Sequence, residues 1–75
     1  MSTTDIVRMA NQISDFFNAY PHDQAVRETA NHLRNFWDPR MRAQLFTHLS
    51  EGGEGLSELA LEAARLLEDE SQPVR

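Results

Sequence analysis

The sequence predicts an all-α protein, a small bundle of about four short helices. Apolar side chains recur every three or four residues along most of its 75 residues, which is the period of an amphipathic helix. Proline, glycine and capping residues interrupt this period near Pro21, at Asp38-Pro39 and at Gly52-Gly53. A chain of this length forms a single helical domain, here residues 1–75.

The first periodic segment predicts a helix that begins with a cap at Thr4 or Asp5 and stops at Pro21. Its apolar stripe consists of Ile6, Met9, Ala10, Ile13, Phe16, Phe17 and Tyr20. Its polar face consists of Arg8, Asn11, Gln12 and Asp15. This division into two faces is typical of a helix that buries one side against a core.

The second segment predicts a helix from about Asp23 to Phe36. One face carries Val26, Ala30, Leu33 and Trp37, with Ala25, Thr29 and Phe36 beside it. Because only Pro21-His22 separates this helix from the first, the two should form an antiparallel pair.

A third helix should begin at Pro39 and end near Ser50. Asp38 is a favoured N-cap, and proline suits the first helical position because its missing N–H would have no partner there. One side of this helix carries Arg42, Leu45, Phe46 and Leu49.

A fourth helix follows a flexible glycine loop, residues 51–55, and is expected to run from a cap at Ser57 to about Glu68. Its apolar face consists of Leu56, Leu59, Ala60, Ala63, Leu66 and Leu67, with Leu61 and Ala64 beside them. This face is wider than one stripe, which suggests a second contact. Acidic side chains oppose the helix dipole at the C-terminal end. Residues from about 4–68 should therefore be ordered, and residues 69–75 should form a disordered acidic tail.

The composition excludes several kinds of chemistry. The chain has no cysteine and no lysine, which rules out disulfides, thiolate nucleophiles and Schiff bases. His22, His32 and His48 lack the spacing of metal-binding helical pairs and are expected at the surface. The glycine loop has no lysine after it, which favours a plain loop over a phosphate cradle. We therefore expect no catalytic residue, no metal site and no bound cofactor in this chain.

The net charge of −5 is concentrated in the last third of the chain. Seven acidic residues and two arginines follow Ser50, whereas the residues up to Ser50 contain five of each. An acidic excess disfavours binding to a phosphate backbone, so nucleic acid is not an expected partner. The longest apolar run, Leu59-Ala60-Leu61, is far too short for a membrane span or a signal peptide. We expect a cytoplasmic protein that does not bind a membrane.

The small size of the chain favours a protein partner. A domain of this length buries only about 60–65% of the surface that its unfolded chain exposes. Its stability must come from good helix packing, from self-association or from a larger partner. Every cationic side chain apart from the histidines is arginine, the residue best suited to forked ion pairs at interfaces.

The segment from Trp37 to Arg42 is the candidate partner site. Arg34 lies one turn before Trp37, and tryptophan and arginine are enriched at binding hot spots. On the third helix Arg40 and Arg42 lie about 200° apart, so that Arg42 borders the core stripe while Arg40 is free to reach outward. Two interpretations remain open: Trp37 is a core residue beside a local Asp38–Arg42 pair, or this corner contacts a partner. Both can hold together, with a corner that is rigid inside and presents arginine outside.

Three strings in the sequence resemble a known family. The chain is similar to the delta subunit of the soluble, NAD-dependent, molybdenum-containing formate dehydrogenases of bacteria over roughly Ile6 to Leu67. The most specific string is Phe36-Trp37-Asp38-Pro39-Arg40-Met41-Arg42. The others are Arg8-Met9-Ala10-Asn11-Gln12-Ile13, and Gly52-Gly53 with Gly55-Leu56.

The resemblance implies a non-catalytic accessory subunit of an enzyme that oxidises formate and passes electrons to NAD. In that family the alpha subunit carries the molybdenum cofactor and most iron–sulfur clusters, while the beta and gamma subunits carry flavin and further clusters. The delta subunit carries no cofactor and supports assembly or stability, most plausibly by docking on the alpha subunit. The partner-binding residues expected here are Arg8, Gln12, Arg34, Trp37, Arg40, Met41 and Arg42.

The alternative function is that of a transient maturation factor for insertion of the molybdenum cofactor into that enzyme. Arginine side chains would suit the pyrophosphate of such a cofactor, because they form forked hydrogen bonds with phosphate oxygens.

Overall fold

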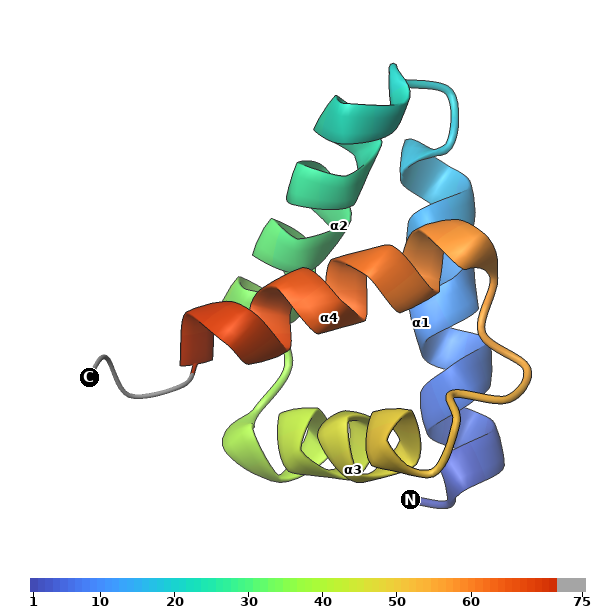
Figure 1. The fold of residues 1–75 in the computed structure, drawn as a ribbon, viewed down its shortest axis with the longest axis vertical. Coiled ribbons are helices and arrows are strands. Elements are labelled where there is room, and N and C mark those ends of the chain that lie inside the picture. The colour runs from blue at the N-terminus through green and yellow to red at the C-terminus, as the bar shows by residue number, and fades with distance from the viewer. Residues whose placement is uncertain (72–75) are drawn as a thin grey trace.

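The computed structural model describes residues 1–71 and contains four α-helices in that range (Figure 1). They are α1 (Thr3–Phe17), α2 (His22–Phe36), α3 (Pro39–Ser50) and α4 (Glu58–Ser71). The described residues contain no strand, so the predicted all-α class is confirmed. None of these helices is long and apolar enough to cross a bilayer.

Helices α1 and α2 run in opposite directions from the loop that joins them, as predicted, and α4 crosses both of them (Figure 1). Helix α3 lies across the end of the pair that is farthest from this loop. Helix α4 contacts all three other helices and packs most extensively against α2. The core lies where they meet and consists of Ile6, Ala10, Ala30, Leu33, Trp37, Leu45, Ala60, Ala63, Ala64 and Leu67.

The cap of α1 differs from the prediction of Thr4 or Asp5. Ser2 caps the helix: its hydroxyl accepts a hydrogen bond from the Asp5 N–H (3.2 Å), while the Asp5 carboxylate accepts one from the Ser2 N–H (3.3 Å). This reciprocal capping box satisfies two backbone donors at once. The backbone N–H of Ser2 and then its side chain lower the pKa of Asp5, with a further contribution from Arg8.

The end of α1 also differs from the prediction. The helix ends at Phe17 rather than continuing to Pro21, and the intervening residues form a turn in which the Tyr20 N–H donates to the Phe17 carbonyl (3.1 Å).

The predicted bounds of α3 are confirmed. Asp38 caps its start, because the carboxylate accepts a hydrogen bond from the Met41 N–H (2.9 Å). At its end the N–H groups of Gly53 and Gly52 donate to the carbonyls of His48 (2.9 Å) and Leu49 (3.1 Å). This is the Schellman pattern, which needs a left-handed residue that glycine supplies at φ 113° for Gly52.

Ser57 caps α4 as predicted, since its hydroxyl accepts a hydrogen bond from the Ala60 N–H (3.1 Å). The far end of this helix contradicts the predicted tail. Helix α4 continues through residues 69–71, because Arg34 of α2 pairs with Glu70 and the Ser71 hydroxyl donates to the Leu67 carbonyl (2.9 Å). The rest of the expected tail, residues 72–75, lies outside the described residues.

The wide apolar face of α4 is used largely inside the chain. Ala64 is fully buried, and Leu61 packs over the glycine loop so closely that a Cβ on Gly53 would lie 2.8 Å from the Leu61 Cδ1. The second contact suggested by this face is therefore an internal one. Gly53 itself has φ 67°, a left-handed conformation that other residues rarely adopt, which explains why the loop carries glycine at this position.

The predicted apolar faces of α1 and α2 are wrong at their edges. Phe16 is 76% exposed, Phe36 is 74% exposed and Tyr20 is 44% exposed, whereas Ser14, which the predicted stripe left out, is buried. Thr29, which was predicted beside the apolar face of α2, is buried as expected. The small side chains of Ser14 and Thr29 suit the close packing of the helices, and the large rings lie outside the core.

Candidate docking surfaces

The structure places Trp37 in the core at the end of α2. Its side chain is only 5% exposed and belongs to the main apolar cluster. Of the two interpretations left open by the sequence, the core role is the one that the structure confirms. In the isolated chain the indole offers a partner very little surface.

Arg42 closes the C-terminal end of α2. One guanidinium nitrogen, Nη1, donates to the backbone carbonyl of Trp37 and to that of Arg34 at 3.3 Å. The last carbonyls of a helix have no partner within the helix, so the guanidinium satisfies two of them. The expected Asp38–Arg42 side-chain pair is absent among residues 1–71, because Asp38 caps α3 and Arg42 turns toward α2.

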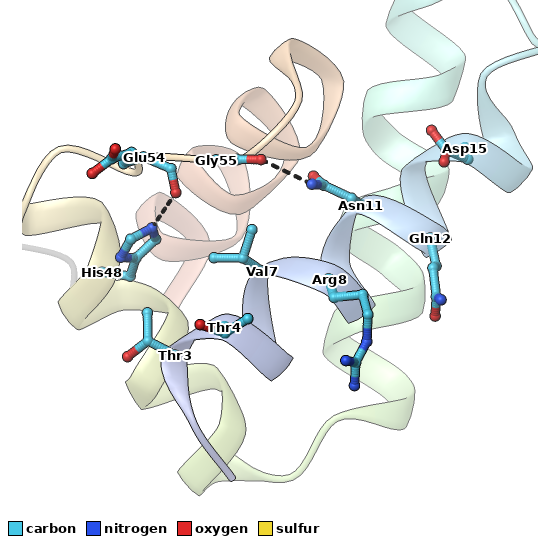
Figure 2. A pocket seen from close by; sticks show the side chains of 10 residues that line it. All are labelled: Thr3, Thr4, Val7, Arg8, Asn11, Gln12, Asp15, His48, Glu54 and Gly55. Carbon is cyan, nitrogen blue, oxygen red and sulfur yellow. Dashed lines mark hydrogen bonds between the residues drawn. The ribbon is translucent and has the colours of Figure 1, made fainter.

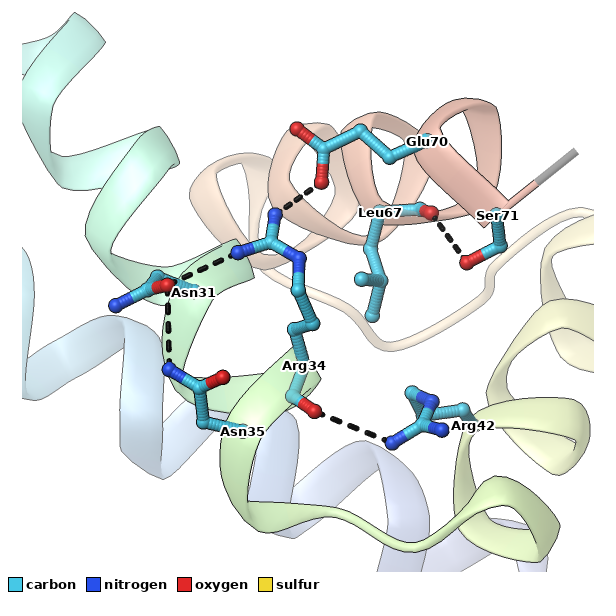
Figure 3. Close-up of polar contacts among 7 residues, drawn as sticks. All are labelled: Asn31, Arg34, Asn35, Arg42, Leu67, Glu70 and Ser71. Atoms are coloured by element: carbon cyan, nitrogen blue, oxygen red, sulfur yellow. Dashed lines mark hydrogen bonds and ion pairs between the residues drawn. The ribbon is translucent and has the colours of Figure 1, made fainter. Parts of the chain in front are cut away.

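Arg34 joins α2 to the end of α4, as Figure 3 shows. Its guanidinium pairs with the Glu70 carboxylate and also donates to the Asn31 side-chain oxygen (2.9 Å), which accepts a second hydrogen bond from Asn35 (3.2 Å). The arginine is therefore held in the surface of the chain by neighbours from two helices.

The remaining two residues of the corner differ from each other. Met41 is half-buried and packs against the core. Arg40 is exposed and makes no ion pair or side-chain hydrogen bond within residues 1–71. The structure thus brings Arg34, Trp37 and Arg42 together at the end of α2, and their polar contacts there are mostly internal.

Arg8 and Gln12 lie far from that corner in sequence, on α1, and line a groove of about 640 Å³ between α1 and the glycine loop (Figure 2). Arg8 pairs with Asp5 at 3.0 Å within the same helix. Gln12 is exposed and has no internal partner in the described residues. That Arg8 and Gln12 contact a partner stays a prediction.

Asn11 holds the glycine loop, which forms the side of this groove opposite α1. Its side-chain nitrogen donates to the Gly55 carbonyl (2.9 Å), and its side-chain oxygen accepts a hydrogen bond from the Ser57 N–H (2.8 Å). The hydroxyl of Ser14 lies 3.0 Å from that of Ser57. Asn11 belongs to one of the sequence strings, and its role in the structure is to hold the glycine loop and the start of α4 on α1.

Sequence reasoning missed an exposed cluster of rings between α1 and α2. Adjacent ring centroids lie 4.6 to 6.2 Å apart, and the cluster consists of Phe16, Phe17, Tyr20, His32 and Phe36. We call it the aromatic cluster. The apolar stripe predicted for α1 spans about 120° at 3.6 residues per turn, close to the roughly 100° that one buried face requires. Its width therefore gave no signal, and only the packing of the chain shows that Phe16, at the edge of the stripe, is exposed.

The other two histidines lie at the surface, each with one neighbour. The His22 Nε2 lies 2.8 Å from a Glu62 carboxylate oxygen, and the His48 Nε2 lies 2.7 Å from the Glu54 carbonyl. Within residues 1–71 no group of three or more histidine, cysteine, aspartate or glutamate side chains is arranged to hold a metal ion.

Comparison with protein families identifies one match. The family model for the NADH-dependent formate dehydrogenase delta subunit FdsD matches residues 5–64. The chain belongs to this family. Comparisons with curated proteins and with solved structures gave no match.

The FdsD match extends over the structural features described above. It includes nearly all of α1, all of α2 and α3, the glycine loop and the first half of α4. The Arg42 contacts with α2, the two hydrogen bonds of the Asn11 side chain and all five members of the aromatic cluster lie within it. The Arg34–Glu70 pair has one partner beyond it.

Proposed function

We propose that this chain is a non-catalytic accessory subunit that supports the assembly or stability of an NAD-dependent formate dehydrogenase by docking on its alpha subunit. Membership of the FdsD family is the observation that carries the proposal. The molybdenum cofactor and most iron–sulfur clusters would reside in the alpha subunit, and flavin with further clusters in the beta and gamma subunits.

The contacts of the arginines support a structural role. Arg34 pairs with Glu70, and Arg42 closes the end of α2, so the two guanidinium groups already hold α2 to α4 and to α3. A maturation factor that bound a pyrophosphate would need such groups free for forked hydrogen bonds. These internal contacts favour a permanent subunit over a transient factor.

The small size of the chain supports docking on a larger protein. A core in a chain of this length supplies about 3–5 kcal/mol at most. A partner that binds only the folded form of this chain raises its free energy of unfolding by mass action. Docking on a larger protein would therefore add to the stability that the small core supplies.

The test is the stoichiometry of the active enzyme. The complex is purified through a tag on the alpha subunit, and the ratio of this chain to alpha is measured by quantitative mass spectrometry. We expect a constant ratio in the active enzyme, and a subcomplex of alpha with this chain when the beta and gamma subunits are left out. Finding the chain only with inactive, cofactor-free alpha would refute the proposal and support the maturation role.

A further inference from the structure

Arg34, Trp37 and Arg42 are engaged in internal contacts, and Arg40 is the exposed arginine of this corner without one in the described residues. The most exposed large apolar side chains are those of Phe16 and Phe36, and the ring of Tyr20 is also exposed. All three belong to the aromatic cluster. A contiguous set of exposed rings is unusual on a monomeric protein and is typical of an interaction site.

The aromatic cluster lies on the side of the α1–α2 pair that α4 leaves uncovered. Ser14 faces the start of α4, and Phe16 lies two positions later, about 200° around α1. On α2, Arg34 pairs with Glu70 of α4. Phe36 lies two positions after Arg34, again about 200° around the helix. Figure 1 shows α4 crossing one face of this pair, so both phenyl rings project from the opposite face.

Three members of the cluster help to line a shallow groove of about 280 Å³, and no aspartate, glutamate, lysine or arginine side chain lines it. The groove is lined by Gln12, Ile13, Phe16, Phe17 and His32. Depletion of charge around aromatic side chains is characteristic of the fully buried centre of an interface. The complementary surface is therefore apolar and uncharged, with protruding aliphatic or aromatic side chains that fill the groove.

The exposed area decides between a second copy of this chain and a larger partner. Aromatic side chains bury about 150–250 Å² each, so the exposures of Phe16, Phe36 and Tyr20 leave roughly 300–500 Å² of ring surface open. A symmetric dimer through these rings would bury about twice that area, below the roughly 1,200–2,000 Å² of a stable interface. A second copy would also double the net charge of −5.

A larger partner can cover more of α1 than the rings alone. Gln12 lines both the groove of the aromatic cluster and the groove of about 640 Å³ beside the glycine loop. The two concave surfaces therefore adjoin along the outward side of α1. A partner that spans both grooves would bury more surface than the exposed rings alone provide.

We infer that the aromatic cluster, together with the adjoining outward side of α1, is the surface by which this chain docks on an apolar surface of the alpha subunit of the formate dehydrogenase. The inference rests on the proposed function and specifies its site. Phe16 and Phe36 are the anchors, and Gln12 lies between the two grooves that the partner covers.

The test compares the double variant F16S/F36S with wild type and with the matched control E58S/R65S. The control replaces two exposed residues of α4 with serine, so it makes a similar change in helix propensity on another face and leaves the net charge unchanged. Each purified chain is titrated onto enzyme prepared without it. Circular dichroism and thermal unfolding first establish that all three are folded, and the single variants F16S and F36S replace the double variant if it is not.

We expect wild type and E58S/R65S to bind equally and F16S/F36S to bind at least about tenfold more weakly. Binding of F16S/F36S within twofold of wild type would overturn the site while leaving the proposed function in place. Absence of binding by wild type would overturn both. Sedimentation of the isolated chain adds a further outcome: a wild-type dimer that F16S/F36S abolishes would assign the cluster to a second copy instead.

Discussion

Asn11 connects α1 to the glycine loop and to the start of α4. Its side chain makes two hydrogen bonds, one to the Gly55 carbonyl and one from the Ser57 N–H. Asn11→Ala leaves both backbone groups without these partners, which costs about 1–3 kcal/mol where such groups are buried from water. The expected result is a fall of several degrees in the thermal midpoint, measured by circular dichroism.

The neighbouring exposed Gln12 supplies the control for that measurement. Gln12→Ala should change the free energy of unfolding of the isolated chain by less than about 0.5 kcal/mol, since the side chain has no internal partner in the described residues. If the two alanine variants unfold at the same temperature, the two hydrogen bonds of the Asn11 side chain contribute nothing to the free energy of unfolding.

Asp5 gives the chain a small dependence of stability on pH. Its pKa is lowered in the fold, chiefly by the Ser2 backbone hydrogen bond, so its stabilising effect is present above the unfolded pKa of about 3.9. The effect is lost as the pH falls through the lower folded pKa. The thermal midpoints of wild type and Asp5→Asn should therefore differ at pH 7 and converge between pH 4 and pH 2. A difference independent of pH would contradict this assignment.

The residue roles that could be predicted from sequence were the local ones. Asp38 and Ser57 cap helices through groups three positions away, so the sequence around each contains all the necessary information. The role of Arg42 depends on the corner between two helices, because its targets are carbonyls of α2 rather than the nearby Asp38. Which of these hydrogen-bond acceptors Arg42 takes depends on how the helices pack, so the local sequence could not predict it.

At the scale of the helices, the last turn of α4 depends on α2. The Arg34–Glu70 pair spans 36 positions of sequence, and it lies where acidic side chains oppose the helix dipole. Glu70→Gln should raise the amide hydrogen-exchange rates of residues 68–71. Because both side chains are more than 40% exposed, the free energy of global unfolding should change by less than about 1 kcal/mol. Unchanged exchange in this turn would show that the pair does not hold it.

The bounds of the helices show which signals sequence reasoning can use. Asp38 and Pro39 define the start of α3 locally, and the prediction matched. The end of α4 depends on a contact with a distant helix, and there the prediction stopped short of the observed end at Ser71. Periodicity identified Phe16 and Phe36 as apolar, but the direction from which α4 approaches decides which apolar side chains are buried.

At the scale of the whole molecule, the stability of the chain depends strongly on Trp37. Replacing a buried tryptophan with alanine costs about 3–5 kcal/mol, which is comparable to the whole stability expected of a core in a chain of this size. The isolated Trp37→Ala variant should therefore show no cooperative thermal unfolding transition at 25 °C and above. A cooperative transition with unchanged helix content would contradict the core role. Loss of binding in this variant would report unfolding rather than a lost contact, so it cannot replace F16S/F36S as a test of docking.

The central claim is that the folded chain is a subunit that binds the alpha subunit of the enzyme. The most direct measurement is native mass spectrometry of the purified alpha subunit mixed with this chain, in the absence of beta and gamma. We expect a stable complex of alpha with the chain that retains its mass after gel filtration. Free alpha and free chain, or a complex formed only when beta or gamma is present, would contradict it.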